Sequence, residues 1–218
     1  MSKAEYGLLP ILLLLFSPEF IPAATAAASS SITGRRPPIP TLTDVSFIKS
    51  SCLATRYPAL CIRYLSGYAA VIRRSDHHLA QVALLISLSR ARSAASFVTR
   101  LSRARGLGQW DHGAVIDCVE NMGDTVDRLA QSVHEIARAG RSAGGNFEWH
   151  MSNVQTWVSA ALTDETTCMD GFTRRSPGDP IVKVAVRRRV VNVAQVTSNA
   201  LALVNRFASR HQSAAGMP

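Results

Sequence analysis

The spacing of the cysteines is the feature that most constrains the fold of this 218-residue chain. Cys118 and Cys168 are 50 residues apart, and their midpoint lies within residues 140–146, a turn-like stretch rich in glycine. Two antiparallel helices that meet at this turn would bring the two cysteines level, because both helices rise by the same amount per residue. The spacing therefore favours a helical hairpin closed by a disulfide.

A second pair, Cys52 and Cys61, shows the same symmetry on a smaller scale. Its midpoint falls just before Tyr57 and Pro58, and a proline ends one short helix and can open the next. Four cysteines allow three pairings. The two turns favour pairing within each hairpin over the other two arrangements, and two bridged hairpins argue against a metal site.

The first residues predict export from the cell. Lys3 precedes an apolar run over residues 8–16 that is too short to span a bilayer, and small residues follow at 23–28. We expect residues 1–28 to be a signal peptide, residues 29–42 a flexible linker rich in Ser, Thr, Arg and Pro, and residues 43–212 the folded domain. Secretion also provides the oxidising conditions in which disulfides form.

Helix signals dominate the expected domain. Two short helices are expected to begin at Thr43-Asp44 and at Pro58, and a first long helix at a cap formed by Asp76. The third long helix is expected to run from about residue 148 to residue 170 or 172. Aromatic residues make up only 6% of the chain, so strand signals are few.

The second and fourth long helices carry apolar seams with alternating steps of four and three residues, the spacing of one helix face. The seam of the second is Val115, Val119, Met122, Val126, Leu129, Val133 and Ile136. The seam of the fourth, which Asp179 and Pro180 open, is Val186, Val190, Val193, Thr197, Ala200, Val204 and Phe207. Together the helices predict an all-α fold, an up-down-up-down four-helix bundle with an N-terminal short helical hairpin and two disulfides.

Charge is distributed unevenly along the chain, whose formal net charge is +9. Residues 111–172 contain ten acidic residues against three arginines, whereas the rest of the chain after residue 28 holds 20 basic and 3 acidic residues. Asp117, Glu120, Asp124 and Asp127 recur every three or four residues and so form one stripe on a helix. Like charges at this spacing repel, so the stripe indicates a cationic partner; the alternative is a solvated face balanced by the basic helices.

Four segments follow one another around the cysteines in a distinctive order. They are residues 47–52 with 57–61, Asp117-Cys118 with residues 126–129, residues 154–168, and residues 199–203. In this order they resemble the plant invertase and pectin methylesterase inhibitor family, over roughly residues 41–210. The resemblance implies a secreted four-helix bundle with the same two disulfides, no catalysis and no cofactor.

Such proteins bind a cell-wall enzyme one to one and block its active-site cleft. In the pectin methylesterase branch, the face around the second and third long helices makes the contact. Carried over to this chain by the resemblance, that face contains Glu120, Asp124, Asp127, Gln155, Asp164, Thr167 and Asp170.

The invertase branch usually carries a Pro-Lys-Phe motif near its third helix, and residues 146–150 lack it. We therefore expect a monomeric inhibitor of pectin methylesterase in the apoplast and cell wall. The first alternative is an inhibitor of a cell-wall or vacuolar acid invertase. The second is a basic wall-polysaccharide-binding protein, and weak contact of residues 187–189, three successive arginines, with acidic pectin is a further expectation.

No sequence pattern points to an enzyme, a nucleic-acid partner or a metal. There is no nucleophile-elbow motif and no phosphate-binding glycine loop. His77 and His78 are adjacent, point in different directions on a helix and lack nearby carboxylate or thiolate partners, so we expect them to be structural or surface residues.

Overall fold

The computed structural model describes residues 41–215, so the expected signal peptide and all but the last two residues of the expected linker lie outside the described residues. Within this range the chain forms helices and no strand. The elements are α1 (Leu42–Cys52), α2 (Pro58–Leu65), the 3₁₀ helix η1 (Ser66–Tyr68), α3 (Ala69–Ile72), α4 (Asp76–Ser102), α5 (Gln109–Ala139), α6 (Gly144–Asp170) and α7 (Pro180–Ala215). None of these helices combines the length and apolar character that a bilayer span requires.

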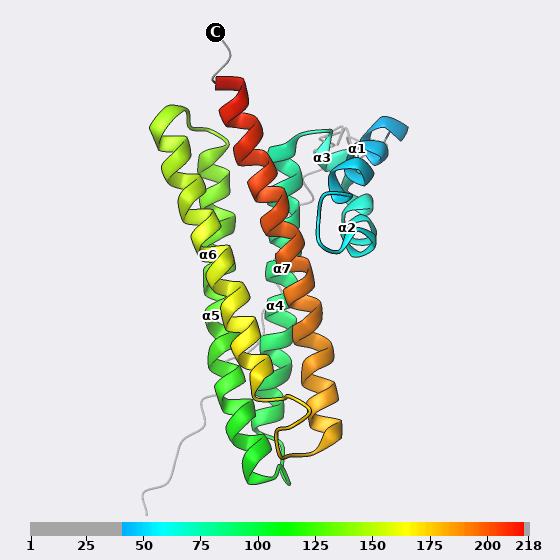
Figure 1. Cartoon of the computed structure of the whole chain (residues 1–218), viewed down its shortest axis with the longest axis vertical. Coiled ribbons are helices and arrows are strands. Elements are labelled where there is room, and N and C mark those ends of the chain that lie inside the picture. Colours follow the sequence, from blue (N-terminus) through cyan, green and yellow to red (C-terminus); the bar gives the residue numbers. More distant parts are fainter. Residues whose placement is uncertain (1–40, 216–218) are drawn as a thin grey trace, which may run out of the picture. The chain divides into compact units, whose positions relative to one another are not determined.

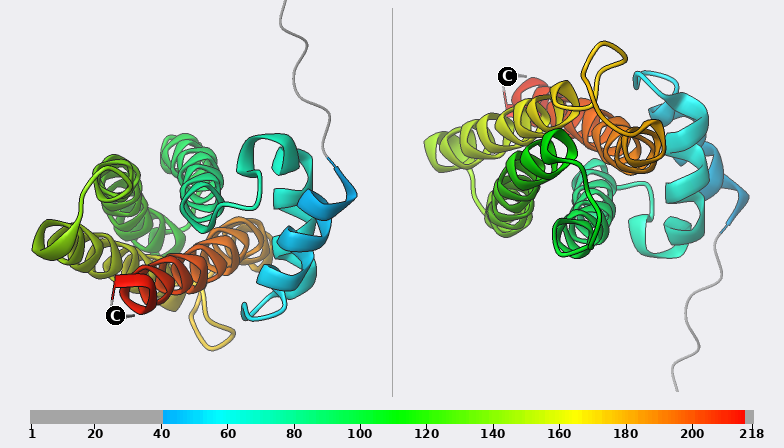
Figure 2. Two further views of the ribbon diagram at one scale, coloured as in Figure 1. Left: turned by 90° about the horizontal axis from the view of Figure 1, so that it is seen from above. Right: turned by 90° about the horizontal axis from the view of Figure 1, so that it is seen from below.

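The four long helices form the predicted up-down-up-down bundle (Figure 1). Each packs against two neighbours, in the ring order α4, α5, α6, α7 (Figure 2). The short N-terminal helices lie beside α4 and α7, which they contact. The fold class is therefore confirmed, and the α5–α6 side of the bundle is opposite the α4–α7 side.

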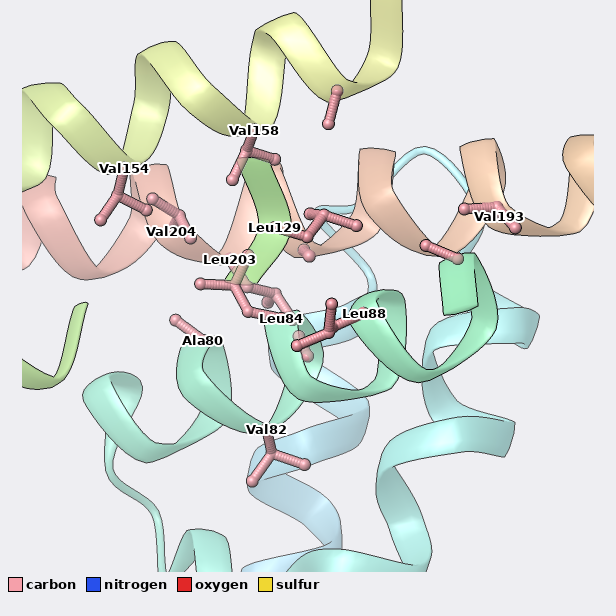
Figure 3. Close-up of a cluster of buried hydrophobic side chains, with 14 of the residues drawn as sticks. Ala80, Val82, Leu84, Leu88, Leu129, Val154, Val158, Val193, Leu203 and Val204 are labelled. Atoms are coloured by element: carbon pink, nitrogen blue, oxygen red, sulfur yellow. The ribbon is translucent and has the colours of Figure 1, made fainter. Parts of the chain in front are cut away.

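All four long helices contribute to one hydrophobic core. Leu129 of α5 lies among buried side chains of the other three helices, and Val82 lies on the side of α4 that is turned towards the N-terminal helices (Figure 3). Around Leu129 the core contains Leu84, Leu88, Val154, Val158, Val193, Leu203 and Val204.

The predicted seam of α7 is confirmed, since all seven of its residues are buried. The predicted seam of α5 is only half right. Every second member is fully buried, but Val119, Val126 and Val133 are half-buried. The second buried line is instead Cys118, Thr125, Ser132 and Ala139.

Small side chains explain this difference. They let neighbouring helices approach α5 closely, and the hydroxyls of Thr125 and Ser132 are satisfied by the carbonyls of Asn121 and Arg128, at 2.9 and 2.8 Å. A buried hydroxyl that is bonded to its own helix costs little. Val119, Val126 and Val133 still pack against the core, but apolar character alone does not identify the more deeply buried line beside them.

Two predicted helix starts were also wrong. Thr41, not Thr43-Asp44, caps α1, and Asp44 completes a capping box by accepting the Thr41 backbone N–H at 3.0 Å. Ser75 caps α4 by accepting the His78 N–H, which leaves the carboxylate of Asp76 available to partners on α7. Arg206 and Arg210 pair with it at 2.7 and 3.1 Å.

The third long helix begins earlier than expected, at Gly144, and takes up part of the predicted turn. Its first turn buries Phe147, which stacks on His211 of α7 with ring centroids 3.6 Å apart. Burial of this aromatic ring offsets the poor helix propensity of Gly144 and Gly145.

Both disulfides close the hairpins that the spacing favoured. Cys52–Cys61 joins α1 to α2 with Cα atoms 5.6 Å apart, and Cys118–Cys168 joins α5 to α6 with Cα atoms 4.3 Å apart. All four cysteines are buried, and no free thiol is present in the described range.

A side chain at Gly140, at the end of α5, is expected to displace the ring of His77. A Cβ there would overlap the ring of His77, whose Nε2 lies 3.0 Å from the carbonyl oxygen of Ile136. Gly140→Ala should lower the free energy of unfolding by about 1–2 kcal/mol, because the ring must give up this contact. Gly123→Ala is the control: its Cβ would enter open space in the same helix, and it should raise stability by about 1 kcal/mol. Urea denaturation measures both variants. If Gly140→Ala and Gly123→Ala changed the free energy of unfolding in the same direction and by the same amount, the steric explanation would be contradicted.

Candidate functional site

The acidic stripe, Asp117, Glu120, Asp124 and Asp127, lies on the solvent side of α5. All four side chains are exposed, whereas the buried seam of the helix faces its neighbours. Within the described part of the chain, none of these four carboxylates forms an ion pair. The stripe therefore presents uncompensated negative charge to solvent.

Trp110 extends the stripe towards the start of α5. It precedes Asp117 by seven residues, which is two helical turns, and so lies on the same line of the helix. Its side chain is 71% exposed, and Ile116, beside the stripe, is 45% exposed. Trp110 was not among the predicted binding residues, although its heptad spacing from Asp117 was a usable signal.

The edge between α5 and α6 is held by an ion pair and by a hydrogen bond between side chains. Arg128 Nε lies 2.7 Å from Asp164 Oδ2, and His150 Nδ1 lies 2.7 Å from Glu135 Oε1. Burial raises the pKa of Asp164, and this effect exceeds the opposing effect of Arg128. The carboxylate of Asp164 is therefore paired with Arg128 of the same chain, whereas the carboxylates of the stripe are unpaired.

At Glu135 the polar contacts together affect the pKa more than burial does. Burial alone would raise its pKa, but hydrogen bonds from His150 and Asn153, with the nearby charges of His150 and Arg138, outweigh burial and lower the pKa. This carboxylate is 3% exposed, so it joins α5 to α6 and does not contribute to the outer surface.

The outer face of α6 carries hydroxyls more than charge. Thr163, Thr166 and Thr167 are exposed, and each hydroxyl donates to the carbonyl four residues earlier at 2.8–3.3 Å. Asp170, also exposed, lies one turn beyond Thr166. The Cys118–Cys168 bridge places Thr167 at about the level of Glu120, so the acidic stripe and this hydroxyl-bearing face lie side by side.

Gln155 lies apart from the other six predicted binding residues. Its amide donates to Asn205 Oδ1 of α7 at 2.9 Å, so it is on the edge of α6 that faces α7. The structure thus brings Glu120, Asp124, Asp127, Asp164, Thr167 and Asp170 to the α5–α6 side, with Asp164 engaged by Arg128.

Three of the ten acidic residues counted along residues 111–172 are buried. Asp111 accepts the backbone N–H of Asp179 at 2.9 Å, and Glu135 is paired as described. Glu165 is fully buried between α6 and α7, where Thr197 donates to its Oε1 at 2.9 Å. The linear count therefore overstates the surface charge of the hairpin, and the exposed negative charge is concentrated on α5.

Burial raises the pKa of Glu165 to about 8, although the Thr197 hydroxyl opposes the shift. Its second oxygen, Oε2, has no hydrogen-bond partner within the described residues. A carboxyl with one unpartnered buried oxygen is most stable in its neutral form. Glu165 is therefore protonated at neutral pH and below.

Among the residues that the structure describes, no three His, Cys, Asp or Glu side chains come together in a metal-binding arrangement. His77 is half-buried against Ile136 and Phe207, whereas His78 is exposed. Their ring centroids are 5.4 Å apart, with His77 packed in the bundle and His78 at the surface.

Residues 46–203 match the family described as plant invertase/pectin methylesterase inhibitor. The chain belongs to this family. It is accordingly assigned to a class of enzyme inhibitors and not to enzymes.

Several curated proteins are similar to this chain. Pectinesterase inhibitor 9 of Arabidopsis thaliana is 57% identical over 167 residues, which cover 75% of this chain and 81% of that protein. Pectinesterase inhibitor 11 of the same plant is 43% identical over 202 residues, covering 92% and 96%. The 21 kDa protein of Daucus carota is 49% identical over 166 residues, covering 76% and 86%.

The fold is also similar to a solved structure, the crystal structure of mutant form A of a pectin methylesterase inhibitor from Arabidopsis. The TM-score is 0.59 at 19% sequence identity, and the match covers 72% of this chain and 95% of the other. At this identity the similarity concerns the fold alone.

Proposed function

We propose that this protein inhibits pectin methylesterase by binding over its active-site cleft through the α5–α6 side, one inhibitor to one enzyme, in the plant cell wall. The relatives of 57% and 43% identity named as pectinesterase inhibitors support the choice of target. The single observation that carries the site is the unpaired acidic stripe on α5 beside the hydroxyl-bearing face of α6.

The stripe supports binding for an electrostatic reason. Four exposed carboxylates along one helix repel one another, and a cationic surface on the enzyme would remove this repulsion. Charges at the rim of an interface mainly raise the association rate, so added salt should weaken inhibition.

Trp110 is the proposed apolar anchor of the same face. Interfaces obtain much of their binding energy from a few aromatic side chains that enter pockets on the partner. An indole that is 71% exposed in the free protein has apolar surface available for burial.

The expected result of removing the stripe is weaker inhibition with an unchanged fold. Replacing Glu120, Asp124 and Asp127 together with alanine should raise the inhibition constant for a methylesterase about tenfold at low salt, since each exposed charge contributes a fraction of a kcal/mol. Trp110→Ala should weaken inhibition by a similar or larger factor that salt does not change. The measurement is a titration of methylesterase activity, with circular dichroism to verify folding.

The matched control changes the net charge by the same amount as the triple alanine variant, but at positions away from the α5–α6 side. Ser46, Ser50 and Ser89 are exposed positions on α1 and α4, and replacing all three with lysine raises the net charge by three, as the loss of three carboxylates does. This variant should inhibit like the wild type. If the alanine variant also inhibits like the wild type, the site assignment fails although the fold remains.

The family also contains invertase inhibitors, as its description states. A parallel titration against an acid invertase separates the two targets. Inhibition of the invertase alone would overturn the proposed function.

A further inference from the structure

A strongly basic cleft lies on the opposite side of the bundle from the acidic stripe. It has a volume of about 1260 Å³ and is formed by α4, the N-terminal half of α7 and the connection between α6 and α7. In Figure 2 this connection projects beside the beginning of α7. Arg63 of α2 completes the lining.

Seven cationic side chains and no carboxylate line this basic cleft. They are Arg63, Arg90, Arg174, Lys183 and residues 187–189, all arginine. None of the seven forms an ion pair within residues 41–213. So many uncompensated positive charges on one concave surface attract a polyanion.

Three of these cations are held in place, two by aromatic rings and one by a backbone carbonyl. The guanidinium of Arg189 lies 3.6 Å from the ring centroid of Phe97, and that of Arg90 lies 4.7 Å from the centroid of Tyr64. The Lys183 ammonium donates to the backbone carbonyl of Ser176. Groups fixed in this way lose less conformational freedom when a ligand binds.

The neutral lining also suits a sugar chain. Ser93, Asn192 and Gln195 lie in the cleft and can donate to or accept from hydroxyl groups. A guanidinium binds a carboxylate with two parallel hydrogen bonds, which distinguishes a carboxylate from its uncharged methyl ester.

We propose that the basic cleft binds a carboxylate-bearing polysaccharide, namely the de-esterified stretches of pectin that a methylesterase produces. The choice of polysaccharide rests on the proposed function, because the target enzyme converts methyl esters to carboxylates. Since α4 and α7 are opposite α5 and α6, one inhibitor molecule can contact the enzyme and its product at the same time.

The test is a binding titration of the mature protein with a homogalacturonan oligomer of defined length, either fully de-esterified or fully methyl-esterified. We expect binding of the de-esterified oligomer only, measured by calorimetry at low salt. Replacing Arg174, Arg187 and Arg188 with alanine should weaken binding at least about tenfold while inhibition of the methylesterase is retained.

The control variant removes the same charge outside the cleft. Arg92, Arg100 and Arg105 are exposed and do not line it, and their replacement with alanine should weaken binding by less than about threefold. An equal loss in both variants, equal binding of the methyl-esterified oligomer, or no binding at all would overturn the proposal. So would tighter binding to vesicles of an anionic phospholipid than to the oligomer.

The proposed inhibition of the methylesterase and the proposed binding of pectin in the basic cleft can be tested independently. Wild-type protein that binds the de-esterified oligomer through the cleft but does not inhibit the esterase would overturn the proposed function and support the cleft. Inhibition without oligomer binding would overturn the cleft alone.

Discussion

Replacing Cys118 and Cys168 together with alanine is expected to lower the free energy of unfolding by about 4 kcal/mol. The bridge joins residues separated by 50 positions, so it removes many conformations from the unfolded chain. It also ties α5 to α6, the two helices that carry the proposed binding face. Urea denaturation followed by circular dichroism measures the change.

The second disulfide supplies the matched control. Cys52 and Cys61 are separated by only 9 positions, so their replacement with alanine should cost about 2.5 kcal/mol in the same assay. A short-loop variant that is as destabilised as the long-loop variant would show that loop entropy does not govern these bridges. Under conditions where the long-loop variant stays folded, its inhibition should be close to that of the wild type.

The second large effect expected is a loss of stability as pH rises, caused by Glu165. Its pKa is about 8 in the folded protein against an ordinary value of 4.5. Below pH 4.5 the carboxyl is protonated in both states, so it makes no pH-dependent contribution. Between these two values the unfolded chain releases a proton that the folded protein retains. Stability should therefore fall by about 3–5 kcal/mol in total across this window.

Glu165→Gln isolates this contribution. The amide is uncharged at every pH, so the stability difference between variant and wild type should move in favour of the variant as pH rises from about 5 to about 8. Other groups act in both proteins and cancel: burial lowers the pKa of His77, and the lowered pKa of Glu135 stabilises the fold above 4.5. Parallel stability curves for the two proteins would contradict the assignment.

The surface charges divide the bundle into an acidic side and a basic side. The acidic stripe lies on α5, whereas the unpaired arginines of the basic cleft and Lys183 lie along α2, α4, α7 and the connection that precedes α7. The net charge of +9 conceals this division. A partner with a basic surface and a polymer with an acidic one could thus be bound without competing.

Much of the fold was predictable because its signals are local. The midpoints of the cysteine pairs indicated the two hairpins, and the valine-rich seam of α7 was assigned correctly at all seven positions. Turn residues and apolar periodicity depend on a few neighbouring residues, so they can be recognised without the neighbouring helices. The acidic stripe is also predictable from local signals, since helical spacing alone places its four carboxylates together.

The sequence by itself thus determined the helices, their pairing and the side of α5 that is acidic. Only the tertiary structure decided that the small residues Thr125 and Ser132 face the core, that Gln155 turns to α7 and that Glu165 is buried without charge. It alone assembled the basic cleft from segments far apart in the chain. The physical reason is that burial, ion pairing and pKa depend on what the neighbouring helices place around a residue, and helical periodicity does not contain that information.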